Sequence, residues 1–223
     1  MNYRANIDAL NRAGCTDILA ISAVGSLKED YAPGHFVMVD QFIDRTFARE
    51  KSFFGKGCVA HVSMADPICS RLSALAEGAA KSAGAAVHTG GTYLAMEGPQ
   101  FSTKAESRLY RSWDCDVIGM TNMPEAKLAR EAELCYASVA MITDYDSWHP
   151  DHGAVDVSDV IATLRGNGTK ARDMIVALAK AMTPHSTCPN GCDTALEHAV
   201  MTAPAQRDPA LVAKLDAVAG RVL

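Results

Sequence analysis

Apolar runs of strand length alternate with segments of helical periodicity along most of this chain. The runs lie at residues 17–22, 35–43, 85–97, 115–120 and 135–143, and the helical segments lie around them at 3–14, 67–84, 102–113 and 124–133. A continuous apolar run of this length is typical of a strand that is covered on both faces. The alternation therefore predicts an α/β fold, with helices on both faces of a central sheet.

The last third of the chain is predicted to be mainly helical. Residues 155–182 predict a long helix that is interrupted or bent near Gly166-Asn167-Gly168, and residues 195–203 and 209–223 predict two more. The polar linker from Thr183 to Cys192 predicts a loop. With 223 residues, 48% of them hydrophobic, the chain is long enough to bury one sizeable core, so we expect a single domain over residues 1–223.

Charge and hydropathy exclude several classes of partner. The net charge is −5 and no Lys/Arg cluster is present, which argues against nucleic-acid binding because that requires a basic face. The first residues are polar and charged, unlike a signal peptide, and no apolar run approaches the length of a membrane span. We therefore expect a soluble, cytoplasmic protein that binds small molecules or other proteins.

The cysteines predict reduced thiols, since their number is odd and their spacing does not repeat. They are Cys15, Cys58, Cys69, Cys115, Cys135, Cys188 and Cys192. Cys188 and Cys192 are the only close pair. They could form a redox pair or half of a metal site, but the spacing is not C-x-x-C and no second close pair accompanies them. The favoured interpretation is a turn with incidental thiols.

Histidines offer a second candidate for metal binding. The string WHPDH contains His149 and His152, and His61 lies far from both in sequence. The proline and the polar residues predict a surface loop, and the sequence identifies no distant ligand to complete a site. We therefore expect no metal.

Two carboxylates follow the apolar run at 135–143. Asp144 and Asp146 are spaced i, i+2, so in extended geometry both would project from one side of the chain. One could hydrogen-bond to or protonate a heterocycle while the other tunes its pKa. The alternative is that both acids turn the chain and cap the next helix.

Three further side chains near the ends of predicted strands could bind a ligand. Phe101, in a GPQF turn, could stack on a planar ligand, although a lone Phe is more often part of a core. Ser22 and Thr121 could hold an anion together with backbone N–H groups, or could simply cap a helix or turn. The chain lacks the G-x-S-x-G, Walker and G-x-G-x-x-G motifs, so acyl transfer through a serine elbow and the common nucleotide cofactors have no support.

Several long strings, in a fixed order, resemble the 5′-methylthioadenosine phosphorylase branch of the trimeric purine nucleoside phosphorylases. They are ISAVGSL, PGHFVMVDQFIDRT, TYLAMEGPQFSTKAES, DVIGMTNMPEAKLARE and CYASVAMITDYDSW. The resemblance implies one α/β domain with a mixed, partly barrel-like sheet flanked by helices. It also implies a homotrimer whose sites lie at subunit interfaces. The implied reaction is phosphorolysis, in which phosphate is a co-substrate and neither a metal nor an organic cofactor is needed.

By motif, the resemblance assigns contact with the departing base to the loop that carries Asp144 and Asp146, called here the acidic loop. Asp144 would donate a proton or hydrogen bond at purine N7, with Asp146 and Thr143 assisting. Such a donor must stay protonated or share its proton with the base, which a dry pocket favours by raising its pKa.

The other residues that the resemblance assigns would line the ligand. They are Phe101 on the base, Met120 on the ribose, Ile118 and Gly119 along the pocket wall, Ser22, Ala23 and Thr121 on phosphate, Val157, Val160 and Ile161 around the methylthio group, and His61 reaching a neighbouring subunit's site.

Two positions indicate which purine is preferred. The 6-oxopurine phosphorylases of this fold carry Glu after the matching Phe and Asn at the position of Asp144, whereas this chain has Ser102 and Asp144. A carboxylate accepts a hydrogen bond from a 6-amino group, and a mismatched polar group in such a pocket discriminates strongly. The resemblance therefore implies methylthioadenosine, an adenine nucleoside, as the substrate, although phosphorolysis of other purine nucleosides such as adenosine stays open.

The chain also departs from the family pattern at its start. The family begins earlier, with a strand, a glycine-rich phosphate loop and an Arg-His pair, whereas this sequence starts at Met1-Asn2-Tyr3, directly before a predicted helix. Without the first strands, an exposed sheet edge and apolar surface are expected to cause aggregation or altered assembly. We expect weak nucleoside binding with much reduced phosphorolysis. A non-catalytic, nucleoside-binding subunit is the alternative from another class.

Overall fold

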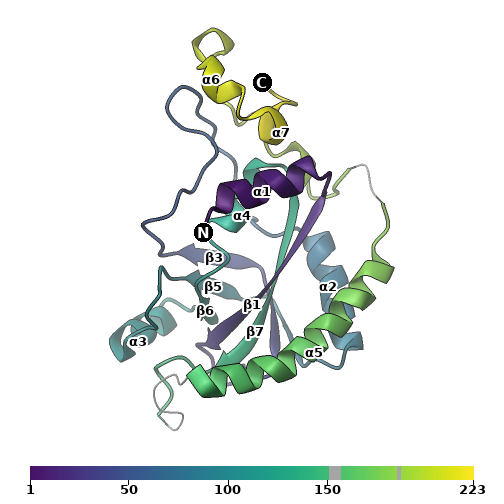
Figure 1. Ribbon diagram of the computed structural model, residues 1–223. Helices are drawn as coiled ribbons and strands as arrows, with labels where there is room; N and C mark the ends of the chain where they lie inside the picture. The colour runs from purple at the N-terminus through teal and green to yellow at the C-terminus, as the bar shows by residue number, and fades with distance from the viewer. Residues whose placement is uncertain (151–156, 185–186) are drawn as a thin grey trace.

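A computed structural model describes residues 1–150, 157–184 and 187–223. Its elements, in chain order, are α1 (Tyr3–Arg12), β1 (Asp17–Ser26), β2 (Phe36–Val39), β3 (Gln41–Asp44), α2 (Ser70–Ser82), β4 (Val87–Thr89), β5 (Thr92–Ala95), α3 (Lys104–Ser112), β6 (Val117–Gly119), α4 (Glu125–Glu131), β7 (Cys135–Asp144), α5 (Val157–Ala181), η1 (Cys192–Thr194), η2 (Pro204–Gln206), α6 (Pro209–Val212) and α7 (Asp216–Ala219) (Figure 1).

The strands form one mixed sheet in the order β3-β5-β6-β1-β7-β2-β4. Its centre is the long parallel pair β1 and β7, which starts at Asp17 opposite Cys135. β6 pairs antiparallel with β1, and β2 pairs antiparallel with β7, whereas the remaining pairs are parallel. The predicted mixed α/β sheet is therefore confirmed.

The sheet curls because two chain segments bend, and each segment supplies one strand near one end of the sheet and one strand near the other. Residues 35–43 and 85–97, each predicted as one strand, break at Asp40 and at Gly90-Gly91. The breaks face each other, since Asp40 N–H donates to the Gly91 carbonyl at 3.2 Å and Gly91 N–H donates to the Asp40 carboxylate at 3.0 Å. Gly90 has φ 81°, which favours glycine. The result is the partly barrel-like sheet that the resemblance implied.

The core lies on both faces of β7. Tyr136, Ala140 and Ile142 pack into one apolar cluster, whereas Val139 and Met141 pack into another. Successive side chains of a strand point to opposite faces, so a strand covered twice needs a continuous apolar run. On one side α2 and α5 pack on each other and on β7, and elsewhere α1 contacts α4 and α7 (Figure 1).

Two boundaries within the sheet and its covering helices differ from the prediction. β1 does not end at Ser22 but continues to Ser26, because its last residues pair with β6. α5 is not interrupted near Gly166-Asn167-Gly168. Asn167 is buried there, and its side-chain N–H donates to the Ile142 carbonyl at 3.0 Å, so the polar segment marks a contact with β7.

The C-terminal segment contains less helix than predicted. Residues 195–203 form turns and an isolated bridge between Ala60 and Val200, and residues 209–223 form the short helices α6 and α7. Apolar residues at helical spacing therefore serve packing here without a long helix. Among the helices of the described ranges, none has both the length and the apolar character needed to cross a membrane.

Candidate active site

A cavity of about 160 Å³ lies where β1, β6 and β7 end and brings most of the predicted site residues together. Its lining residues are Ala23, Val24, Gly25, Met96, Phe101, Ile118, Gly119, Met120, Thr121, Thr143, Asp144, Asp146 and Val160. They come from three strands, the loops after β5, β6 and β7, and the first turn of α5. Segments far apart in sequence therefore meet at one end of the sheet, where α/β proteins usually bind ligands.

Asp144 ends β7 with its carboxyl group at this cavity. The Thr143 hydroxyl donates to Oδ1 of Asp144 at 2.7 Å, and the Asp146 N–H donates to Oδ2 at 2.9 Å. Burial raises the pKa of the Asp144 carboxyl, and these hydrogen bonds oppose the rise. A carboxyl group held in this way can donate a proton to a ligand as well as accept a hydrogen bond. The Asp146 contact also fits the alternative role of turning the chain.

Asp146 lines the same cavity, but its backbone conformation differs from the extended one predicted. Its φ is 47°, so the extended geometry assumed for the i, i+2 pair is wrong. Burial raises the pKa of the Asp146 carboxyl, and the charge of Asp144 adds to the rise, while the hydroxyls of Ser107 and Ser102 oppose it. Burial therefore acts in the same direction on both carboxyl groups.

Gly25 lets the acidic loop approach β1 closely. A Cβ at this position would lie 3.1 Å from Oδ2 of Asp144, 3.2 Å from Cβ of Asp146 and 3.2 Å from the Ile118 side chain. Such contacts are tighter than ordinary van der Waals packing. The absence of a side chain at Gly25 therefore helps to set the shape of the cavity.

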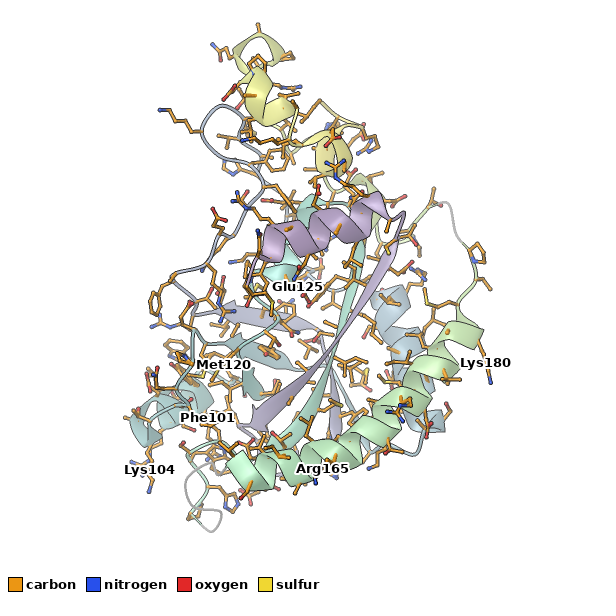
Figure 2. The ribbon with its side chains drawn as sticks, viewed as in Figure 1. Phe101, Lys104, Met120, Glu125, Arg165 and Lys180 are labelled. Carbon is orange, nitrogen blue, oxygen red and sulfur yellow. The ribbon has the colours of Figure 1, made fainter. Side chains whose placement is uncertain are left out.

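Phe101 and Met120 form an apolar wall beside α3 (Figure 2). Phe101 is 47% exposed, so it is not a core residue and leaves ring surface free for a planar ligand. The loop that carries it packs closely on Met120, because a Cβ at Gly98 would lie 2.5 Å from the Met120 sulfur.

A second cavity of about 300 Å³ adjoins the first at Thr121, which lines both. Ser22, Asn122 and Glu125 also line it. The Tyr93 hydroxyl lies 3.4 Å from both the backbone nitrogen and the hydroxyl oxygen of Thr121, and so helps to hold Thr121 in place. Two of the three residues predicted to contact phosphate therefore share one hollow.

Four predicted site residues line neither of these two cavities. Ser102 is buried, with its carbonyl accepting a hydrogen bond from Ser147 at 2.8 Å. Val157 and Ile161 are 58% and 45% exposed on α5. His61 is exposed, and its backbone N–H donates to Ala199 beside the bridge at Ala60.

The histidine motif is only partly described. Nε2 of His149 lies 3.1 Å from a carboxylate oxygen of Glu29, and its ring lies beside those of Tyr145 and Trp148. His152 lies outside the described residues. His149 therefore belongs to an aromatic cluster on the acidic loop.

A larger cavity, about 760 Å³, lies elsewhere and is lined by residues of β2, α2 and the C-terminal segment. Among its charged residues are Asp40, Asp66, Glu77 and Arg130. None of these four residues was predicted to belong to a site. The smaller cavity, with its two buried carboxyl groups, is the stronger candidate for chemistry.

Sequence reasoning missed Arg49, whose guanidinium organises the loops around the cavity. It donates to the carbonyls of Met120 at 2.7 Å, Met123 at 2.5 Å and Glu97 at 2.8 Å. Its side chain is 9% exposed and also contacts the Tyr3 hydroxyl at 3.1 Å. In the sequence, Arg49 lies in a predicted loop at residues 44–57 that also contains Arg45, Lys51 and Lys56. Nothing in that loop singles out one residue.

Comparisons with known proteins find matches along most of this chain. The model of the phosphorylase superfamily matches residues 1–180. An S-methyl-5′-thioadenosine phosphorylase of Cereibacter sphaeroides is 69% identical over 222 residues, covering 99% of this chain and 77% of the relative. The solved structure of a methylthioadenosine phosphorylase from an antarctic soil metagenomic library matches with a TM-score of 0.88 and 44% identity, covering 97% of this chain and 76% of that one. A Schistosoma mansoni methylthioadenosine phosphorylase in complex with adenine matches with a TM-score of 0.82 and 36% identity, covering 87% and 76%.

Proposed function

Because the chain belongs to the S-methyl-5′-thioadenosine phosphorylases of the phosphorylase superfamily, we propose that it cleaves S-methyl-5′-thioadenosine by phosphorolysis. A phosphate oxygen forms a bond to C1′ of the ribose while the bond from C1′ to the purine breaks. The purine takes the electron pair of that bond together with a proton. The products are adenine and 5-methylthioribose 1-phosphate.

The observation that carries this proposal is the buried carboxyl group of Asp144. Its pKa is raised by burial, so it retains a proton at a higher pH than an exposed aspartate does. A departing purine gains negative charge, and a proton or hydrogen bond at N7 stabilises it. The Thr143 hydroxyl, 2.7 Å from Oδ1, orients the carboxyl group for this role, and Asp146 assists from the same cavity.

The walls of the cavity support a base and ribose at this end of the sheet. Phe101 would stack on the base, Met120 would pack on the ribose, and Ile118 and Gly119 would form the pocket wall. The cavity is smaller than a whole nucleoside site usually is, and its volume suits the base. Ser102, which follows Phe101 in the chain, is buried and does not line the cavity, and we propose that it shapes the pocket by packing beside it.

Phosphate would occupy the hollow that adjoins the base cavity. Ser22 and Thr121 line that hollow, and Thr121 and Ala23 line the base cavity, so an anion in the hollow would lie beside a ribose placed at Met120. Hydroxyl and backbone N–H donors suit a phosphate ion. We propose inorganic phosphate as a co-substrate and neither a metal nor an organic cofactor for this reaction.

The exposed residues of α5 support a site that is completed by a second subunit. Val160 lines the cavity while its neighbours Val157 and Ile161 face solvent, although all three were assigned to the methylthio group. A homotrimer would bring such surfaces together with His61 of an adjacent copy.

One assay tests this function. The purified chain is incubated with methylthioadenosine, adenosine or inosine, with and without phosphate, and release of the base is followed. We expect release of adenine from methylthioadenosine that depends on phosphate, and no release from inosine. Equal turnover of adenosine would favour a broader adenine nucleoside phosphorylase. Binding of methylthioadenosine without release in any mixture would favour the non-catalytic alternative.

A further inference from the structure

Four buried cysteines converge outside the candidate active site. They are Cys69 before α2, Cys135 at the start of β7, and Cys188 and Cys192 in the C-terminal segment, and their sulfur atoms all lie within 4.8 Å of one another. None is more than 7% exposed. The sequence has no second close pair beside Cys188 and Cys192, but the fold brings Cys69 and Cys135 to them from separate elements. We propose that these four thiols bind one structural zinc ion.

The spacing of the sulfur atoms fits one tetrahedral ion. Four thiolates at the usual zinc–sulfur distance of about 2.3 Å form a tetrahedron whose edges are about 3.8 Å. The sulfurs of Cys69 and Cys188 are 3.7 Å apart. A disulfide requires about 2.05 Å, and all seven cysteines are free thiols. Two ligands of one zinc ion cannot be separated by more than about 4.6 Å, so the cluster is close to the size that the ion requires.

The loop from Cys188 to Cys192 is already shaped to present two ligands. Its C-x₃-C spacing falls within the range of zinc ligand pairs. Gly191, at φ 64°, turns the chain, and its N–H donates to the Cys188 carbonyl at 2.9 Å. The Asn190 N–H points to the Cys188 sulfur at 3.4 Å, as expected of a donor that stabilises a thiolate ligand.

Hydrogen bonds hold this loop against the start of α2, where the third ligand lies. The Asn190 side chain donates to the Ser70 hydroxyl at 2.8 Å and accepts from the Arg71 N–H at 3.3 Å. Cys69 is the N-cap residue of α2, at the positive end of the helix dipole. The geometry of three ligands is thus fixed by backbone and amide contacts that do not depend on the thiols themselves.

The surroundings suit a site that carries negative charge and excludes water. Zinc with four thiolates has a net charge of −2, and the Arg71 guanidinium lies within hydrogen-bonding reach of Cys135 while it pairs with Asp17. Leu72 and Ala137 pack in the same cluster, with Leu19, Ile68 and Met182 around it. Soft thiolates in tetrahedral geometry select zinc over the hard cations.

Four protein ligands leave no open position on the ion, so its role would be structural. The site joins the start of β7, the start of α2 and the C-terminal segment 187–223, whose own helices are short. Metal binding would therefore anchor that segment to the sheet, because the free energy of binding adds to the stability of the folded state. This inference does not depend on the proposed phosphorolysis.

The test is the metal content of the whole chain, purified without chelator and under reducing conditions. We expect about one zinc ion per chain by elemental analysis, little zinc in Cys135→Ser and Cys192→Ser, and full zinc in the control Cys58→Ser. Cys58 is equally buried but outside the cluster. Cobalt exchanged into the wild-type chain should give the strong visible absorption of tetrahedral thiolate coordination.

A measurement on the wild-type chain alone guards against variants that fail to fold. Zinc should protect Cys69, Cys135, Cys188 and Cys192 from alkylation at native conditions, as read by peptide mass spectrometry, and removal of the metal should lower Tm. Absence of zinc after exposure to the ion and desalting would overturn the proposal. So would iron in place of zinc, unchanged zinc in folded Cys192→Ser, or a disulfide within the four cysteines of the reduced preparation.

Discussion

The guanidinium of Arg49 donates to the main-chain carbonyl of Met120 at 2.7 Å, and so joins the loop after β3 to the wall of the base cavity. The same side chain donates to the carbonyl of Glu97 at 2.8 Å, in the loop that carries Phe101. One planar group with five donors thus fixes the loops after β5 and β6 relative to each other. Arg49 itself does not line the base cavity, so we regard it as a positioning residue.

Arg49→Ala is expected to lower both stability and turnover. Removing the guanidinium leaves several partly buried carbonyls without their donor, at a cost of about 2–4 kcal/mol in the free energy of unfolding. Loosening of Met120 and Phe101 should raise the KM for methylthioadenosine more than it lowers kcat. Arg49→Lys should recover only part of the loss, because an ammonium group cannot serve the same set of acceptors. Urea unfolding and steady-state kinetics measure both effects.

Arg4→Ala is the matched control for this experiment. Arg4 pairs with Glu50 at 2.5 Å, but the two side chains are 40% and 69% exposed. Exposed ion pairs contribute less than about 1 kcal/mol, so stability and KM should stay near their wild-type values. An equal effect of the two substitutions would contradict the positioning role of Arg49.

Asp144→Asn is expected to abolish adenine release while leaving the fold intact. The amide cannot supply the proton at N7, and loss of a general acid typically costs about 10²–10⁴ in rate. Adenine binding, measured by calorimetry, should weaken less than kcat falls, because the amide still offers hydrogen bonds. Asp30→Asn, at an exposed position, is the control and should retain full activity. Undiminished release by Asp144→Asn would exclude Asp144 as the donor.

The buried acids also predict how stability depends on pH. Burial raises the pKa of Asp146 above its usual value of 3.8, so the folded state holds this proton to a higher pH than the unfolded state does. The contribution of Asp146 to stability is therefore full below about pH 3.8 and falls as pH rises through its native pKa. Asp44, whose pKa is lowered by its lysine partners, acts in the opposite direction. The contribution of Asp146 must therefore be measured as the difference in stability between the wild type and a variant at position 146.

Asp146→Asn isolates this contribution. Asn tolerates the positive φ of 47° and cannot ionise, so it removes the cost of a buried charge without straining the backbone. The variant should be more stable than the wild type at pH 7, and the difference should shrink as pH falls toward 4. Urea unfolding across this range measures the difference. A constant difference at all pH values would show that ionisation of Asp146 is not its cause.

The parts of the fold that could be predicted from sequence are those determined by local pattern. The apolar run of β7 indicates a strand covered twice, and Asp144 directly after it indicates a carboxyl group at a strand end. Phe101 was singled out by its GPQF turn and Met120 by the resemblance, and the structure places both in one cavity with Asp144. Their roles in binding stay predictions.

Features that depend on distant pairing could not be predicted. The bend at Asp40 is matched by glycines about fifty residues later, so neither segment alone reveals the break between strands. Cys69 and Cys135 carry no local signal either, and they meet Cys192 only because α2 and β7 start at the same side of the sheet. Such contacts follow from sheet order, which local periodicity does not determine.

Gly119 gives a last prediction, because the site requires this position to lack a side chain. A Cβ there would lie 2.0 Å from the Tyr93 hydroxyl, and Tyr93 is fully buried. Gly119→Ala should therefore cost about 1–3 kcal/mol in stability and displace the hydroxyl that supports Thr121. If Thr121 binds phosphate, the KM for phosphate should rise more than the KM for the nucleoside.

Two further variants identify the cause of that loss. Tyr93→Phe in the Gly119→Ala background removes the closest clashing atom and should restore part of the stability, although the ring carbon at 2.7 Å still crowds the new methyl group. Gly78→Ala, within α2 and with no atom within 4 Å of the added Cβ, should instead gain up to about 1 kcal/mol through helix propensity. Thermal unfolding compares the three chains. Equal destabilisation by both glycine substitutions would show that lost backbone freedom, and not contact with Tyr93, limits position 119.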